Sequence, residues 1–221
     1  MPRQNIPSYI VEIPADGPNE KLAGAAFADA LQRCSSNNPK SLMIVVPQKS
    51  NIPEWIETFI GASAVKALKK DGSISFEGVS LHLEGVRTFN PHVKYGVVFG
   101  VNLDKKDLNK LDDTLEANAI YFVQWSVADG QYWARSWQPA IVGTSNWKLI
   151  YPTLPGVVEE ELRKLPANNL RHPNDLKTVR ASLKALKAKS QNVDPMLVRK
   201  WALQRGWRPS DADDLMREAA K

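Results

Sequence analysis

The stretch Leu42-Met43-Ile44-Val45-Val46 is an unbroken run of five apolar residues. Such a run has to be covered on both faces, which is typical of a strand at the centre of a parallel sheet. Polar residues follow at positions 48–51, so the strand should end near Pro47. Two similar runs, Tyr95–Phe99 and Ala119–Val123, predict two more buried strands.

Amphipathic segments separate these strands. Apolar residues recur at helical spacing over Glu20–Cys34, over Ile52–Lys70, and after Asp104, whose side chain is a good N-cap. Strands and helices that alternate in this order favour a sheet joined by right-handed crossovers. The sequence therefore predicts an α/β fold, a Rossmann-like, mostly parallel sheet with helices on both faces.

Two turn signals predict antiparallel pairs. Glu77-Gly78 separates two short alternating segments within residues 73–83. Asp129-Gly130 separates Phe122–Val127 from Gln131–Ser136, and Asp-Gly is a strong signal for a two-residue hairpin. We therefore expect the second pair to form an edge hairpin.

The stretch Tyr151–Gly156 is the best candidate for a linker, because its prolines and glycine interrupt both periodicities. A short helix should follow over Val157–Leu165. The predicted organisation is an α/β domain over residues 1–150, a linker with a short helix over 151–172, and a basic three-helix domain over 173–221, which forms a small C-terminal helical bundle.

Charge is unevenly distributed along the 221 residues, whose net charge is +5. Residues 1–150 hold 15 Lys or Arg against 15 Asp or Glu, whereas residues 151–221 hold 14 against 9. An asymmetry of this kind indicates a polyanionic partner for one region only.

Composition also bears on location. No apolar run approaches the roughly 20 residues that span a bilayer, so no membrane segment is expected. Residues 1–8 lack the apolar core of an export signal, and we expect a cytoplasmic protein. The single cysteine, Cys34, has no histidine near it in sequence and is expected to be a buried, unreactive thiol.

The first helix of the C-terminal region carries two stripes. Its apolar residues are Leu176, Val179, Leu183 and Leu186, and the residues that follow them are Lys177, Arg180, Lys184 and Lys187. These cations lie about 100° around the helix from the apolar face. No acid interrupts them, although opposite charges four residues apart would support the helix. The stripe is therefore either a binding surface or a solvated face.

Further cations surround the second helix of this region: Arg199, Lys200, Arg205 and Arg208. Asp194-Pro195 predicts the start of that helix, and Gly206 predicts its end. Ser210 is the expected N-cap of the third helix, with Asp213 at its third position. Acids at the start of this third helix would repel phosphates, so we expect contact with the phosphate backbone along the first two helices and little base readout.

Polar residues follow the predicted strands, at the edge where ligands bind in parallel sheets. The ligand-crevice candidates are Asp16, Asn19, Gln48, Lys49, Asn102 and Asp104, and Gln124 and Ser126 follow the third buried run. Such groups could hold a nucleotide or a sugar. The phosphate-binding motifs GxGxxG and GxxxxGK[ST] are absent, and the three histidines form no HxxxH or HExxH pair. We therefore predict no cofactor, no metal site and no catalytic residue.

These observations lead to one leading hypothesis and two alternatives. The leading one is a non-enzymatic nucleic-acid-associated protein, whose basic helices contact phosphates, with DNA preferred over RNA, and whose α/β domain recognises a ligand or a protein. The alternatives are a nucleotide- or phosphoester-processing enzyme that uses the strand-end crevice, and an interaction module for an acidic protein. Homo-oligomerisation stays open.

Overall fold

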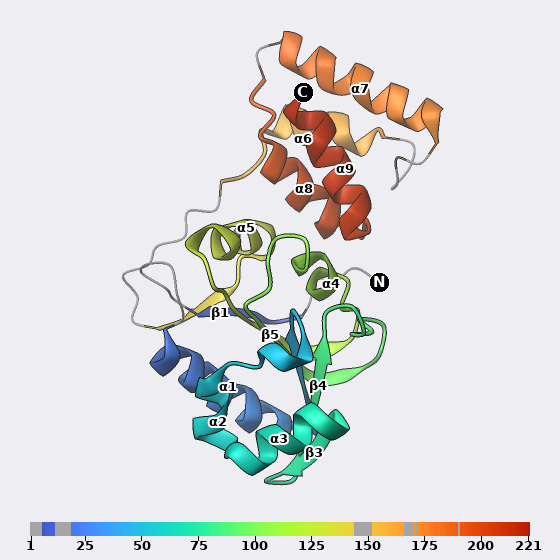
Figure 1. Ribbon diagram of the computed structural model, residues 1–221. Coiled ribbons are helices and arrows are strands. Elements are labelled where there is room, and N and C mark those ends of the chain that lie inside the picture. The colour runs from blue at the N-terminus through green and yellow to red at the C-terminus, as the bar shows by residue number, and fades with distance from the viewer. Residues whose placement is uncertain (1–5, 12–18, 144–151, 166–169, 171, 190) are drawn as a thin grey trace. The chain divides into compact units, whose positions relative to one another are not determined.

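The computed structural model describes residues 6–11, 19–143, 152–165, 170, 172–189 and 191–221 (Figure 1). The chain divides into two compact units, which we treat separately. Of the described residues, the α/β unit holds those from 6 to 134 and from 139 to 143, and the helical unit holds those from 135 to 138 and from 152 to 221. The predicted linker over 151–172 thus falls within the second of these units and contains a helix of its own.

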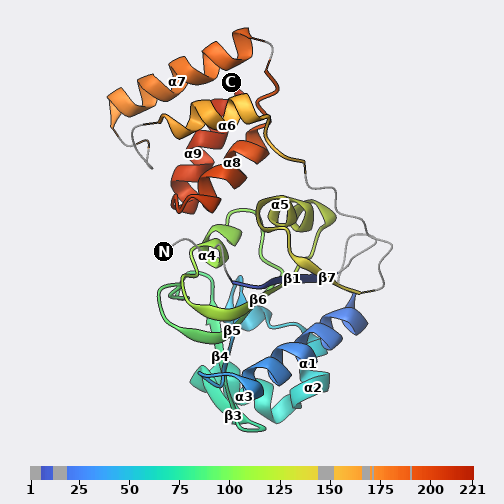
Figure 2. The ribbon, with the colours of Figure 1, turned by 180° about the vertical axis from the view of Figure 1, so that it is seen from behind.

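A seven-stranded sheet, in the order β3-β4-β2-β5-β6-β1-β7, forms the centre of the α/β unit (Figure 2). Its strands are β1 (Ser8–Val11), β2 (Ser41–Val46), β3 (Ser73–Phe76), β4 (Val79–Gly85), β5 (Tyr95–Val101), β6 (Ala117–Val123) and β7 (Ala140–Val142). Every neighbouring pair is parallel except β3 with β4. The three unbroken apolar runs are β2, β5 and β6, which lie side by side, so the predicted mostly parallel sheet is confirmed.

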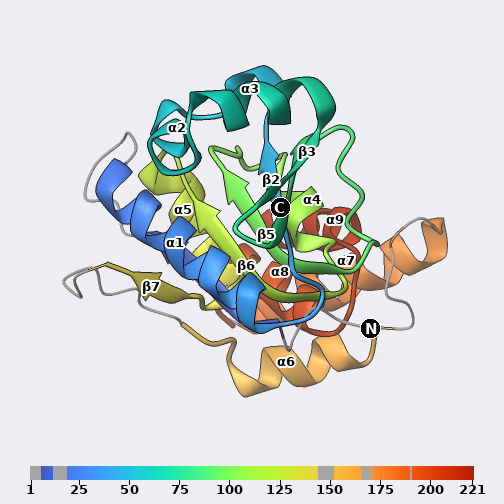
Figure 3. The same cartoon turned by 90° about the horizontal axis from the view of Figure 1, so that it is seen from below.

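Helices cover both faces of this sheet. On one face, Phe99 contacts Phe27 of α1 (Glu20–Ser36) and Trp55 of α2 (Glu54–Ile60), and α3 (Ala62–Asp71) adds to the same core. Figure 3 shows these helices in front of the sheet. Phe99 is paired with Tyr121 of β6, so these two side chains lie on the same face of the sheet. Successive side chains of a strand alternate between the faces, so Phe122 points to the opposite face.

On that opposite face, Phe122 contacts Trp133 of α5 (Val127–Trp137), with the ring centroids 5.4 Å apart. The indole Nε1 of Trp133 donates to Asp112, the last residue of α4 (Leu108–Asp112). Both helices thus pack on this side, which confirms the predicted arrangement with helices on both faces.

One of the two predicted hairpins is correct. β3 and β4 pair antiparallel at the sheet edge, and their turn residues Glu77 and Gly78 both have positive φ values, 49° and 79°. These values are those of the type I′ turn that suits two-residue hairpins. The edge hairpin is therefore present, but it is formed by residues 73–85.

The hairpin predicted around Asp129-Gly130 is wrong, because this segment is the start of α5. The backbone N–H of Asp129 donates to Ser126 Oγ at 3.1 Å, and Ser126 Oγ donates to the Asp129 carboxylate at 2.5 Å, an exchange that caps the helix start. Gly130 packs closely against Gln124, where a Cβ atom would lie 2.9 Å from Gln124 Cγ. Close packing therefore explains this glycine, and no turn is needed.

The helical unit is built on one apolar core. Its helices are α6 (Gly156–Arg163), α7 (Pro173–Ala188), α8 (Pro195–Gln204) and α9 (Pro209–Ala220). Apolar residues from all four meet in the core, among them Leu162, Val179, Trp201 and Leu215. Asp194 caps α8 by accepting from the backbone N–H groups of Met196 and Leu197, and Gly206 has a φ of 79° just after the helix, as predicted.

Candidate nucleic-acid interface

The first helix of the predicted interface, α7, starts and packs as its sequence requires. His172 Nδ1 accepts from the backbone N–H of Asn174 at 3.2 Å, and Pro173 occupies the first helical position. The apolar stripe turns inward, with Val179, Leu183 and Leu186 each buried. The neighbouring basic stripe is left outside, and all four of its cations are exposed.

Two of these cations are held by the end of α9. Arg180 makes a bidentate pair with Glu218, with Nε to Oε2 at 2.8 Å and a terminal nitrogen to Oε1 at 3.0 Å. Lys187 Nζ donates to the backbone carbonyl of Ala219 at 2.7 Å, and Lys221 Nζ also donates to Glu218, at 2.6 Å. Arg180 and Lys187 thus dock α7 onto α9 as well as carrying charge.

The other two cations, Lys177 and Lys184, have no hydrogen-bonding or ion-pair partner among the described residues. They are seven residues apart on α7, which places them two turns and about 10 Å from each other on one face. Lys187 adds a charge that no carboxylate neutralises, because its partner is a carbonyl group. The outer face of α7 is therefore net positive, although Glu218 offsets part of the stripe.

The Arg180–Glu218 contact leads to a prediction about pH. Hydrogen bonding from Arg180, together with that from Lys221, outweighs the opposing effect of burial and lowers the pKa of Glu218 from its ordinary 4.5 to about 2. A depressed pKa stabilises the folded state above pH 4.5, and this contribution is lost as the pH falls from 4.5 towards 2. Glu218→Gln should therefore lower the Tm at pH 6, and the difference from the original protein should shrink between pH 4.5 and 2.5 in thermal scans.

A matched control for this prediction is Glu57→Gln on α2, because Glu57 is exposed and forms no ion pair within the described residues. Its Tm should track that of the original protein across the same pH range. An equal pH dependence in the two variants would show that the Arg180–Glu218 pair contributes no stability.

Of the four cations predicted around α8, Arg199 is a correction. Its side chain is fully buried, with Nε 2.6 Å from Asp213 Oδ1 and a terminal nitrogen 2.7 Å from Ser136 Oγ. A guanidinium in this position cannot reach a phosphate at the surface. The reason is that α8 is apolar on most of its circumference, so Arg199 lies against α9 and binds an acid there.

The other three cations predicted around α8 differ in their exposure. Lys200 is only 8% exposed. Arg205 is exposed, and its guanidinium lies 4.9 Å from the centre of the Trp201 ring and 3.5 Å from Glu159. Arg208 is exposed at the N-cap position of α9. Only Arg205 and Arg208 therefore present charge at the surface, and Arg205 shares its charge with a carboxylate.

The predicted cap of the third helix is wrong by two residues. α9 begins at Pro209, so Arg208 is the N-cap residue and Ser210 lies inside the helix. Proline favours the first helical position, and that preference decides the start here. The acids that follow are largely engaged within the unit, since Asp211 is 4% exposed, Asp213 pairs with Arg199 and Asp214 pairs with Arg217.

The strand-end candidates of the α/β unit come together only in part. Gln48 and Lys49 follow β2, and Asn102 and Asp104 follow the neighbouring strand β5, so these four lie at one edge of the sheet. β2 leads to α2 and β5 leads to α4, which cover opposite faces, and ligand crevices in this fold class form at such a divergence. Asn19 follows β1, which β6 separates from β5. Asp16 lies outside the described residues.

Most of these side chains are engaged in local contacts. Lys49 Nζ lies 3.2 Å from Glu84 Oε1 at the end of β4. Asp104 Oδ1 accepts from the backbone N–H groups of Lys106 and Asp107, and Asn19 Oδ1 accepts from that of Leu22. These contacts neutralise the lysine and satisfy the helix and turn starts, so the set offers little unpaired positive charge for a phosphate.

Two amide oxygens at this edge are unsatisfied. Asn102 has a positive φ of 55°, and its Oδ1 atom is buried without a hydrogen-bond partner. Gln124, at the end of β6, is fully buried; its Nε2 donates to the Val11 carbonyl at 2.6 Å, while its Oε1 atom has no partner. Both oxygens are buried, so they are unsatisfied groups of the interior at the strand ends and not acceptors exposed to a ligand.

Cys34, the single cysteine, is buried. Burial raises the pKa of the Cys34 thiol to about 12, and its Sγ atom lies 3.1 Å from the Ser41 carbonyl. No three His, Cys, Asp or Glu side chains gather as a metal-binding group in the described part of the chain. Among the helices of that part, none combines the length and apolar character that crossing a bilayer requires.

The fold and the charge distribution together define an α/β protein that carries a basic four-helix unit. Residues 154–221, which include α6 to α9, match the model of a family described as a domain of unknown function, DUF1889. No curated protein and no solved structure matches the chain. The match thus covers the helices of the helical unit and none of the strands.

Proposed function

We propose that this is a non-enzymatic nucleic-acid-associated protein in which the outer face of α7 contacts the phosphate backbone. The observation that carries the proposal is the exposure of Lys177 and Lys184 on one helix face without an acidic partner among the described residues. Arg180 and Lys187 flank them and are held in place by α9. The α/β unit supplies recognition of a ligand or a protein partner.

The contact is electrostatic and independent of base sequence. Lysine binds phosphate as a point charge, and each neutralised phosphate releases counterions from the duplex. The logarithm of the affinity should therefore fall with the logarithm of the salt concentration, with a slope of about −0.9 for each phosphate contacted. Contacts from Lys177, Lys184 and Lys187 would give a slope of about −3.

The test is fluorescence anisotropy with a labelled DNA duplex, from low to physiological salt, for the original protein and for Lys177→Glu/Lys184→Glu. We expect the affinity to fall about ten-fold or more and the salt slope to lose about 2, because two phosphate contacts are removed. An RNA duplex of the same length tests the expected preference for DNA.

The matched control is Lys66→Glu/Lys69→Glu, which makes the same change in net charge at exposed positions of α3 in the α/β unit. This variant should bind DNA nearly as well as the original protein. Absence of binding even at low salt would refute the proposal, and an equal loss in both variants would show that net charge alone drives the association.

Docking to an acidic protein is the second candidate, because the same lysines would serve it. Poly-glutamate added to the DNA complex separates the two. If poly-glutamate displaces the labelled DNA at a lower concentration of negative charge than unlabelled DNA does, the result favours an acidic protein as the partner. The strand-end crevice is a weaker candidate for a phosphoester, because Lys49 is already paired with Glu84.

A further inference from the structure

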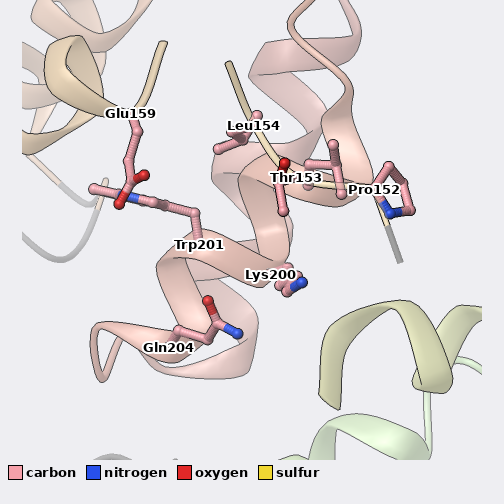
Figure 4. A pocket seen from close by; sticks show the side chains of 8 residues that line it. Pro152, Thr153, Leu154, Glu159, Lys200, Trp201 and Gln204 are labelled. Carbon is pink, nitrogen blue, oxygen red and sulfur yellow. The ribbon is translucent and has the colours of Figure 1, made fainter. Parts of the chain in front are cut away.

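A pocket of about 120 Å³ lies within the helical unit, along one face of α8 (Figure 4). It is lined by Pro152, Thr153, Leu154, Glu159, Leu197, Lys200, Trp201 and Gln204. An engineered cavity of about 150 Å³ in another protein holds benzene, so this space suits a molecule of that size or slightly smaller. Figure 4 shows Lys200, Trp201 and Gln204 extending from the same helix.

The α8 residues that line the pocket form one helix face. Leu197, Lys200, Trp201 and Gln204 are spaced by three, one and three residues, which is the spacing of neighbours on an α-helix. Lysine is an unusual member of such a face, because lysine is almost never buried without a partner. Lys200 is nevertheless only 8% exposed, and Trp201 only 7%.

Two donors of this face lack acceptors. Trp201 Nε1 is buried and has no hydrogen-bond partner. Within the described residues, Lys200 Nζ forms no hydrogen bond or ion pair, and burial alone lowers its pKa. Buried polar groups are normally paired, so an unpaired ammonium group in the lining of a pocket indicates that an acceptor belongs there.

The acidic residue of the lining does not fill this role. The Glu159 carboxylate is already bound by Arg163 at 2.9 Å and by Arg205 at 3.5 Å, and these contacts lower its pKa. The side-chain amide of Gln204 and the hydroxyl of Thr153 add further donors to the lining. The polar part of the pocket is thus suited to an anion.

We propose that this pocket binds a small organic carboxylate. Its carboxylate accepts from Lys200 Nζ, and its apolar body lies against Pro152, Leu154 and Leu197, beside the Trp201 ring that lines the same pocket. This site is independent of the α7 surface, since it uses none of the cations proposed to contact phosphate. Lys200, which the sequence predicted to contact nucleic acid, binds a small anion instead.

The test follows the indole N–H signals of the full chain by ¹H–¹⁵N NMR during titration with benzoate. The chain has seven tryptophans, so Trp201→Phe is used only to assign the Trp201 signal. We expect this signal to move in a saturable way with benzoate and to stay in place with benzamide, which has the same shape without the charge. A Trp201 signal that does not move, or that moves equally with benzamide, would overturn the proposal.

A pair of variants tests the role of the lysine. Lys200→Met keeps the length of the side chain and removes the ammonium group, and it should weaken benzoate binding at least ten-fold. Lys69→Met, at an exposed position of α3, should leave the affinity unchanged. Unchanged binding in a folded Lys200→Met protein would exclude the proposed contact, and the benzoate and benzamide comparison decides the question even where that variant fails to fold.

Discussion

Replacing Arg199 with alanine is expected to destabilise the helical unit by about 3 kcal/mol. The side chain is fully buried between α8 and α9, where its Nε atom lies 2.6 Å from Asp213 and a terminal nitrogen lies 2.7 Å from Ser136. Removing one partner of a buried ion pair leaves the other charge without compensation and opens a cavity. Asp213 is 22% exposed, so water can reach it, and the cost falls at the lower end of the usual range.

Amide hydrogen exchange of α8 and α9 in the full chain measures this change, because it reports on the helical unit separately. The control is Arg217→Ala, which removes an exposed arginine paired with Asp214 on the same helix as Asp213. Exposed pairs contribute about 0–1 kcal/mol, so this variant should stay close to the original protein. Equal protection in the two variants would show that Arg199 is not a structural residue.

Arg199 also illustrates where sequence reasoning about the site fails. Its exposure depends on which sides of α8 pack against other helices. The position of a cation along the sequence does not reveal this packing. A signal was present, because Leu197, Val198, Trp201, Ala202 and Leu203 cover most of the circumference of α8 and are all buried. A helix that is apolar nearly all round is buried, so a cation within it should be expected to have an internal partner.

The α7 stripe was easier to predict. Its apolar and basic residues repeat at the same spacing, so burial of one stripe leaves the other exposed. What the pattern could not show is that α9 supplies Glu218 and the Ala219 carbonyl to two of its cations. Those partners are 38 and 32 residues away along the chain, and only the tertiary packing brings them together.

The fold was predictable for a similar reason. Unbroken apolar runs identify β2, β5 and β6 regardless of their neighbours, since only central parallel strands need cover on both faces. The Asp129-Gly130 prediction failed because the same dipeptide serves two local structures. Asp129 suits the third position of a capped helix as well as a turn, and Gly130 allows close packing against the Gln124 side chain.

Gly96→Ala is expected to destabilise the α/β unit by about 3 kcal/mol. Gly96 lies near the start of β5, and a Cβ atom there would lie 2.2 Å from the Pro39 carbonyl oxygen and 2.5 Å from that of Ser41. Both obstacles are backbone atoms, so relief requires β2 and β5 to move apart at the centre of the sheet, where Gly96 also donates its N–H to Ser41 Oγ. Calorimetry should show a fall in Tm of about 6–12 °C for a domain of this size.

Two other glycines make this prediction specific. Gly156→Ala places a Cβ atom where no other atom lies within 4 Å, and its Tm should not fall. Gly130→Ala meets the side chain of Gln124 at 2.9–3.0 Å, and a side chain can shift more readily than a strand, so its effect should be intermediate. A Gly96→Ala protein as stable as Gly156→Ala would mean that β2 and β5 do not approach as closely as described. The order of the three Tm values therefore measures how rigidly β2 and β5 are held together at the centre of the sheet. Any site at the ends of these two strands depends on that packing.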